Sequence, residues 1–490
     1  MTGRLYKALL VGLALVLLAA ASWTQQKLNV ARTQMGLTRL APLENAPPVL
    51  AFTTVALGSF RGLIANALWI RATELSDEGK YFEMVQLADW ITKLQPHFSA
   101  VWVNQAWNLV YNISIKFNDP KERWQWVLQG IELLRDQGLR YNPKEPLIYR
   151  ELAWFFQHKM GAYLDDAHMY YKQVWAQEMT RVLGGGRPNY EELLNPQTDE
   201  AKARVKLLRE KYKLDPARMK AVDEKYGPLE WRLPEAHAIY WAMIGLELSK
   251  KEDLITLRRV IYQSLQLAFQ RGRLIQNPFN QTAEFGPNLD MIENANRAYL
   301  DMMEQDPESR DHIKTGHRNF LRDAVYFLYT HNRLSEANRW FRQLQEKYPN
   351  LPLITTRAKS LPGTLTLDEY AIARVTEDAS ETSTDRTKAI LEGLWVSTFY
   401  NLALGEDDQA AGYTLLAQKI WNRFQRQIAG QEIRVGLPPL ATLRQEVLNQ
   451  MLNATNELNS QFVAQLRTRL NLPAPTNAPP PATNQPASRN

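Results

Sequence analysis

The sequence predicts an all-α fold, a right-handed solenoid of stacked helix hairpins with an apolar helix in front and a proline-rich tail behind. Three observations lead to this prediction. Good helix formers (Leu, Ala, Gln, Glu, Arg and Lys) dominate the 490 residues, and alternating β-type runs are scarce. Apolar residues recur at helical spacing in paired stretches bounded by Pro and Gly. Such pairs follow one another along most of the chain, which is how a helical solenoid grows.

The clearest repeating unit ends with residues 332–350, NRLSEANRWFRQLQEKYPN. Ala337, a small residue, stands where two helices must touch, Phe341 follows one turn later, then Leu344, and Pro349 closes the unit. The preceding stretch, FLRDAVYFLYTHNR, supplies the partner helix. This pattern resembles a tetratricopeptide (TPR) repeat, which implies a TPR-like superhelix. A TPR unit has no chemistry of its own, but stacked units build a concave surface for other proteins.

The composition limits the possible functions. The net charge of +6 comes from 58 basic and 52 acidic residues that are interleaved, whereas a nucleic-acid interface needs a one-sided basic stripe. We therefore expect no nucleic-acid partner. The chain has no cysteine, which excludes disulfides, thiolate zinc sites, iron–sulfur clusters and cysteine nucleophiles. The 14 Trp and 20 Tyr residues are expected to fill gaps between paired helices rather than to form a ligand cage.

The N-terminal segment is predicted to enter a membrane. Residues 8–23, ALLVGLALVLLAAASW, carry no charge and follow two basic residues. The run can be an uncleaved anchor through residues 5–23 or a signal peptide cleaved near Ala19–Ala21, and Trp23, typical of a membrane interface, favours the anchor. The preceding positive charge predicts a single-pass protein of the cell membrane, with its N-terminus inside and its body on the periplasmic side, although basic residues after the run weaken this bias.

Composition shifts divide the rest of the chain. Pro47-Pro48 ends a linker, and the apolar run 49–70 is predicted to be the first solenoid helix, although it could pair with the anchor or lie on the membrane surface. Gly184–Gly186 lacks the Lys-Ser/Thr of a phosphate loop and is predicted to be a hinge. The segment from Asn277 to Pro287 is predicted to be a loop. The predicted organisation is a signal anchor or signal peptide (1–25), a linker (26–48), N-terminal TPR-like repeats (49–183), a glycine hinge with a charged helical insertion (184–233), C-terminal repeats (234–430), a capping helix (431–470) and a disordered proline-rich tail (471–490).

Motifs for catalysis or metal binding are missing from the sequence. It has no HExxH, GxSxG, Walker or dinucleotide-binding motif. Asp165, Asp166 and His168 crowd one helix start, where acidic residues complement the helix dipole, so we expect no metal site there. Glu235 and His237 form the remaining candidate, although Glu235 also fits a helix-start position. We predict no enzyme activity, no metal and no cofactor, with an envelope-glycan enzyme or an accessory subunit with a cryptic site as the alternative.

Two segments, 59–72 (SFRGLIANALWIRA) and 87–98 (LADWITKLQPHF), resemble bacterial membrane-anchored TPR proteins. In that group a hydrophobic N-terminus leads into such an entry helix, and divergent repeats follow. The resemblance is specific over about 40 residues and looser over most of the remainder. It implies a scaffold in the cell envelope that organises a pilus, secretion or transport assembly. The long second unit, the triglycine and the charged insertion depart from the pattern.

The expected partners are other proteins, such as membrane or envelope proteins, and not a small-molecule substrate. They would lie along the inner faces of the first helices, as a helix or an extended peptide in a groove. A purely structural spacer, for which length matters and the groove does not, is the second alternative. The polar and aromatic positions expected to line the groove are Asn104, Asn108, Asn112, Arg150, Gln157, Tyr240 and Arg322.

Overall fold

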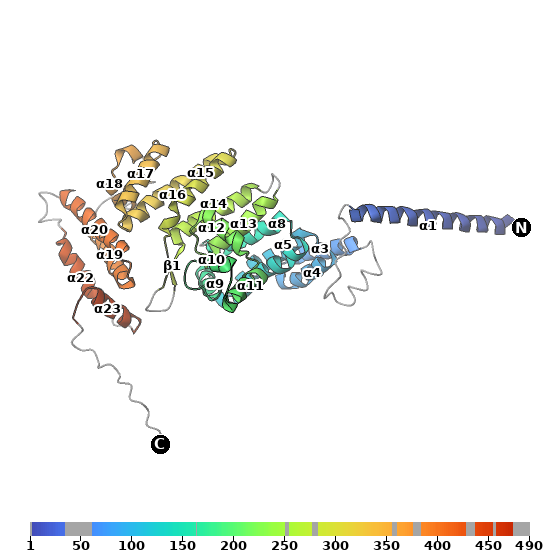
Figure 1. The fold of residues 1–490 in the computed structure, drawn as a ribbon, viewed down its shortest axis with the longest axis horizontal. Coiled ribbons are helices and arrows are strands. Elements are labelled where there is room, and N and C mark those ends of the chain that lie inside the picture. Colours follow the sequence, from blue (N-terminus) through green and yellow to red (C-terminus); the bar gives the residue numbers. More distant parts are fainter. Residues whose placement is uncertain are drawn as a thin grey trace, which may run out of the picture.

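The computed structural model of the chain is predominantly helical (Figure 1), which confirms the predicted all-α class. The predicted linker beyond residue 34, the apolar run up to residue 60 and the tail beyond residue 473 lie outside the residues that the structure describes. The structure describes residues 2–34, 61–162, 164–249, 254–276, 283–354, 360–375, 384–427, 437–453 and 457–473.

The described part begins with one long helix, α1 (Thr2–Gln34), which projects from the body in Figure 1. It continues past residue 25, where the sequence predicts a linker. Its side chains from Gly12 to Leu28 are exposed. Among the described residues, no helix contains a stretch long and apolar enough to cross a membrane. The side chains of residues 1–11, where the predicted apolar run begins, lie outside that description.

The N-terminal part of the body consists of helix pairs. α3 packs against α4, and α5 with its π-helical continuation η2 packs against α6. The turn between α3 and α4 needs Gly79, whose φ of +71° is strained for other residues. Asp119 caps α6, because its carboxylate accepts the N–H of Lys121 and Pro120 starts the helix. The elements are α3 (Arg61–Asp77), α4 (Tyr81–Leu94), α5 (Ser99–Trp107), η2 (Asn108–Ile113), η3 (Ser114–Lys116), α6 (Pro120–Glu132), η4 (Leu133–Gly138), α7 (Leu139–Tyr141), α8 (Pro146–Trp154) and η5 (Phe155–Gly161).

The charged segment 184–233 contributes to the core. Leu208, Met219 and Trp231 are fully buried in it, and α12 packs against both α13 and α15. Arg232 donates a hydrogen bond to the carbonyl of Gly185 at 3.0 Å. The triglycine is therefore bonded to the residues just before α13. The elements of this region are α9 (His168–Leu183), α10 (Tyr190–Leu194), α11 (Asp199–Glu210), α12 (Pro216–Tyr226) and α13 (Pro234–Leu248).

Helix α13 packs directly against α8 and η5. The stack of helices therefore continues from α8 to α13, which lies about 80 residues later in the chain. From α13 to α18 each helix packs on the next one in the chain, and α20 then packs on α16, α18 and α19. Figure 1 shows these helices lying towards α23 along the long axis of the molecule. The remaining elements are α14 (Leu254–Arg271), η6 (Leu289–Met291), α15 (Ile292–Gln305), α16 (Arg310–Thr330), α17 (Leu334–Lys347), η7 (Pro362–Thr364), α18 (Leu367–Val375), α19 (Thr384–Leu404), α20 (Asp407–Gln427), α22 (Leu440–Leu452) and α23 (Glu457–Arg469).

The TPR-like pattern marks real packing positions. Ala337, Phe341 and Leu344 are all buried in the pair formed by α16 and α17. At the end of the chain, the predicted capping helix is two helices, α22 and α23, which both pack on α19. A single helix was predicted there because the apolar spacing continues across the break, and residues 454–456 lie outside the described part.

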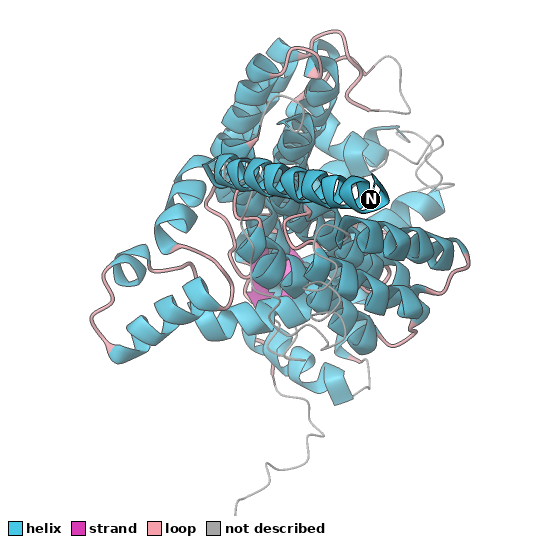
Figure 2. Cartoon of the chain, turned by 90° about the vertical axis from the view of Figure 1, so that its right-hand side faces the viewer, coloured by secondary structure: helices cyan, strands magenta, loops and turns pink. Residues whose placement is uncertain are grey.

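The predicted loop after α14 is partly wrong. Within the predicted range 277–287 lies the strand β2 (Ala283–Gly286), which pairs antiparallel with β1 (Arg273–Gln276) just before that range, and the pair lies among the helices in Figure 2. The hydrogen bond that Tyr400 donates to Glu284 links β2 to α19. Arg273 forms a 2.6 Å ion pair with Glu406, which precedes α20. These side-chain contacts to distant helices hold in place strands that are too short to be recognised from their own sequence.

Candidate partner-binding groove

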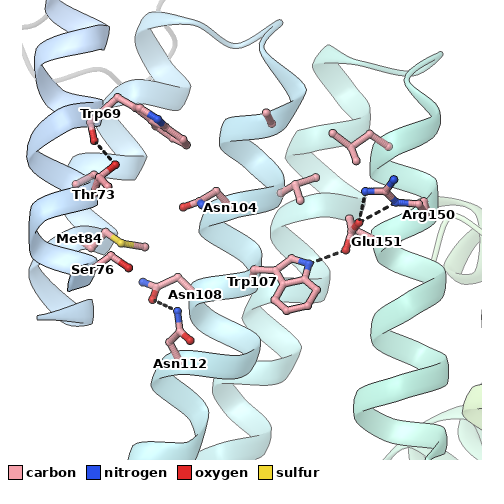
Figure 3. A pocket seen from close by; sticks show the side chains of 14 residues that line it. Trp69, Thr73, Ser76, Met84, Asn104, Trp107, Asn108, Asn112, Arg150 and Glu151 are labelled. Atoms are coloured by element: carbon pink, nitrogen blue, oxygen red, sulfur yellow. Dashed lines mark hydrogen bonds and ion pairs between the residues drawn. The ribbon is translucent and has the colours of Figure 1, made fainter. Parts of the chain in front are cut away.

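A groove of about 600 Å³ lies between α3, α5 with η2, and α8. Figure 3 shows Trp69 and Thr73 on one wall, the three asparagines in the middle and Arg150 on the far wall. α3, α5 and α8 each begin one of the first three units predicted from the sequence. Four of the seven predicted residues, Asn104, Asn108, Asn112 and Arg150, line this one groove.

The three asparagines form a row because a spacing of four residues places them on one face of the continuous helix α5–η2. The Asn112 amide donates to Oδ1 of Asn108 at 3.2 Å, and the Asn108 amide donates to the carbonyl of Tyr81 at 3.1 Å. The Asn104 carboxamide is exposed and makes no hydrogen bond within the described residues. The row is therefore anchored to α4 through its middle member, Asn108, and offers a free amide at Asn104.

The far wall of the groove is electrically neutral. Arg150 lies 2.8 Å from Oε1 of Glu151, and the indole N–H of Trp107 donates to Oε2 of Glu151 at 2.6 Å. Glu151 is buried, so its charge is compensated by the arginine beside it rather than by water. A ligand that enters the groove meets no uncompensated charge on this wall.

Aromatic rings supply the remaining surface. Trp107 is 38% exposed and packs against Tyr111 in a tilted arrangement, with 4.4 Å between ring centroids. Trp69 is half-buried, and its indole N–H makes no hydrogen bond within the described residues. Aromatic faces beside free amide and indole donors suit an extended polypeptide, because the rings cover apolar side chains and the donors bind main-chain carbonyls.

Two predicted groove residues belong to the core instead. Tyr240 is 2% exposed, and its hydroxyl accepts the N–H of Asp215 at 2.9 Å and donates to the carbonyl of Lys213 at 3.2 Å. Gln157 is buried in η5, which packs against α9, α13 and α14. Both are inaccessible to a partner because their side chains are buried between packed helices.

The seventh predicted residue, Arg322, lines a different cavity of about 400 Å³ between α14, α15 and α16. The amides of Gln266 and Gln270 donate to Oδ2 of Asp323 in its wall at 3.1 and 2.8 Å. Arg374 contacts Oδ1 of the same carboxylate at 2.9 Å. The predicted residues are therefore divided between two cavities rather than gathered in one.

Sequence reasoning missed Trp69, Thr73, Ser76, Trp107 and Glu151 among the groove residues. Trp107 stands three residues after Asn104, so the helical period that selected the asparagines also selects it. Of the residues from α3, Trp69 lies in the first segment that resembles membrane-anchored TPR proteins, and Thr73 and Ser76 follow that segment four and seven residues after Trp69. This helical spacing from Trp69 would have identified all three if that face of α3 had been paired with α5.

Glu235 and His237, the candidate residues of the enzyme alternative, lie in a buried cluster. Lys172 Nζ lies 3.0 Å from Oε1 of Glu235, with the two side chains 1% and 2% exposed. His237 Nε2 lies 2.9 Å from the carbonyl of Trp231, and desolvation lowers the pKa of His237 to about 4, so the imidazole is neutral and its Nε2–H donates. Neither Glu235 nor His237 lines either of the two cavities. This geometry supports a role in packing.

A second buried cluster surrounds Lys159, whose ammonium contacts Asp165 at 2.6 Å and donates to Ser114 at 3.0 Å. Burial lowers the pKa of Lys159, although its bond to Asp165 opposes this. Burial disfavours the charged form of Asp165, but the hydrogen bond and charge of Lys159, the N–H of Ala167 and the charge of Arg123 together lower the pKa of that carboxyl. Arg123 binds the other oxygen at 2.7 Å. Within the described residues, no group of three or more His, Cys, Asp or Glu is arranged to hold a metal.

Comparisons of the chain with protein-family models, curated proteins and solved structures find no match. The groove and helix α1 are therefore the features of the molecule that bear on its function. The groove combines a free amide, exposed tryptophan surface and a compensated charge pair. Together these features favour binding of a polypeptide over catalysis.

Proposed function

We propose that the protein is a membrane-tethered scaffold, a TPR-like right-handed solenoid that holds a partner polypeptide in the groove between α3, α5 and α8. The observation that carries this proposal is the convergence of three consecutive first helices on one neutral, aromatic and amide-lined groove. TPR-like arrays bind partners along the inner faces of such helices. The proposed setting is an assembly in a bacterial cell envelope, such as a pilus, secretion or transport complex.

Helix α1 supports the membrane tether. Its large apolar side chains between Leu13 and Leu18 are 56–66% exposed. Apolar surface left in water costs about 25 cal/mol per Å², so a helix of this kind gains free energy by entering a lipid core. Lys27 lies 3.9 Å from the ring centroid of Trp23, and this aromatic–basic pair suits a membrane–water interface. The proposed orientation keeps the N-terminus inside and the body on the periplasmic side.

A photo-crosslinking amino acid at position 104 tests the proposal in intact membranes. Position 129 on α6 is the matched control, because Gln129 is exposed and lies outside the groove. Crosslinking at 104 but not at 129 should capture a fixed set of polypeptides, and deletion of residues 1–22 should release the protein from the membrane and reduce that capture. Equal capture at both positions would show that the groove is not the binding surface, and would favour the structural spacer.

A further inference from the structure

The groove offers three hydrogen-bond donors that are not used within the described residues. The indole N–H of Trp69, the amide of Asn104 and the hydroxyl of Ser76 all line it, and none of them donates within the described residues. Thr73 is already used, because its hydroxyl donates to the carbonyl of Trp69 at 3.0 Å. A ligand that pairs these donors must bring hydrogen-bond acceptors.

A proline-rich chain has this property, because proline keeps its carbonyl and has no N–H. The segment 471–490, NLPAPTNAPPPATNQPASRN, contains six prolines, with Pro479, Pro480 and Pro481 consecutive. Sequences of this kind favour the polyproline II helix, whose carbonyls point outwards and whose rings dock between aromatic side chains. Its preformed shape lowers the conformational entropy lost on binding.

Charge complementarity agrees with this pairing. The segment 471–490 has one charged residue, Arg489. The far wall of the groove holds the compensated pair of Arg150 and Glu151, so neither surface requires a strongly charged partner. A volume of about 600 Å³ is large enough for several residues of an extended peptide.

The positions of the two parts in the fold indicate which copy supplies the tail. Figure 1 shows α23, which leads towards the tail, at the opposite end of the elongated body from α3, α5 and α8. Because α23 ends far from the groove of its own copy, we infer that the groove of a neighbouring copy receives the tail. Such a contact joins two different surfaces, and repeated head-to-tail contacts of this kind form an open chain.

We propose that the groove of one copy binds the proline-rich segment 471–490 of a second copy. This inference rests on the proposed function, because it names the partner of the same groove. It gives the scaffold a means of forming a row of tethered copies. Docking of the tail in the groove of its own copy is the competing outcome.

A direct binding measurement uses a fluorescein-labelled synthetic peptide with the sequence of residues 471–490. The receptor is the full chain in detergent with Pro479, Pro480 and Pro481 replaced by Ala, so that its own tail does not compete. We expect saturable binding by fluorescence anisotropy, little affected by salt, and at least about tenfold weaker binding after Asn104→Arg. Gln129→Arg should leave the affinity unchanged. A peptide with the three prolines replaced by Ala should bind at least about tenfold more weakly.

A mixing experiment tests the origin of the tail. By light scattering, the unmodified chain should form dimers and longer assemblies, whereas the Asn104→Arg variant and the triple proline variant should each be monomeric. Their mixture should form only 1:1 pairs, because one variant retains a tail and the other a groove. A mixture that stays monomeric overturns the proposal. Ser76→Lys replaces Asn104→Arg if circular dichroism shows that the latter is misfolded.

The proposed function and the assignment of the tail as the ligand of the groove can be refuted separately. If the crosslinker at position 104 captures another envelope protein while the labelled peptide does not bind, the tail is not the occupant and the proposed function stands. If neither the peptide nor any polypeptide is captured at position 104, both proposals fail. Peptide binding without assembly of the full chain would place the tail in the groove of its own copy, and would overturn the inference about a second copy.

Discussion

Breaking the buried charge pair between Lys172 and Glu235 should destabilise the body strongly. The ammonium of Lys172 on α9 lies 3.0 Å from the carboxylate of Glu235 on α13, and both side chains are almost completely buried. Neither carboxylate oxygen has another hydrogen-bond partner within the described residues. Lys172 is therefore the main compensation for this charge. Glu235→Leu would leave the ammonium unpaired in an apolar environment.

The magnitude follows from desolvation. Removing one partner of a buried pair costs about 3–5 kcal/mol, whereas replacing both with apolar side chains of similar volume is about neutral. We therefore expect Glu235→Leu and Lys172→Met each to lower the free energy of unfolding by about 3–5 kcal/mol. The double variant should recover most of that loss.

Urea denaturation monitored by tryptophan fluorescence measures all four proteins of this cycle. The interaction energy is the difference between the double variant and the sum of the single variants. Single variants that each cost less than about 1 kcal/mol would refute the reasoning, since a cost that small is typical of an exposed pair. A double variant that costs as much as the two single variants together would refute it as well, because the residues would then not act as a pair.

Two further predictions concern packing and pH. Gly412→Ala would place a Cβ 2.0 Å from the carbonyl oxygen of Thr330, where α20 packs on α16. The melting temperature should therefore fall, with a loss of about 1–3 kcal/mol in the free energy of unfolding. Gly393 has open space around it, so the control Gly393→Ala should not destabilise the protein. Burial lowers the pKa of His237 to about 4 and that of His317 to about 3. The contribution of the two neutral imidazoles to the free energy of unfolding is therefore complete above pH about 6.5. It is lost as the pH falls towards these pKa values, by up to about 1.4 kcal/mol per pH unit for each residue. Urea midpoints at several pH values should show a shallower loss for His317→Gln than for the unmodified chain, and equal slopes would contradict this assignment.

Local chemistry made parts of this structure predictable. The Asp-Pro pair at Asp119 predicts a helix start, and the structure has the cap at that position. The small and aromatic positions at Ala337 and Phe341 predict a helix contact, and both residues are buried. The row that starts at Asn104 could be predicted because residues four apart share a helix face. Each of these features depends on neighbours within about two helical turns.

Features that depend on distant segments could not be predicted in the same way. In α13, every residue from Pro234 to Ala242 is buried, so the sequence of this helix has no polar stripe that would orient Tyr240. It packs against α8, η5 and α14, which come from segments before and after it in the chain. The strand pair that begins at Arg273 depends on contacts to α19 and to the turn before α20 in the same way.

The stacking of α13 on α8 also explains why the groove could be predicted only in part. α8 forms the far wall of the groove and carries Arg150 and Glu151, and the surface behind it is covered by a helix about 80 residues away. The pair of Lys172 and Glu235 connects α9 to α13 across the whole charged segment 184–233. Loss of this pair should therefore loosen α8 and weaken peptide binding at Asn104, although Glu235 does not line the groove. Peptide binding that returns in the double variant would show that the wall depends on this distant packing, whereas unchanged binding in the destabilised single variants would show that α8 holds its place without α13.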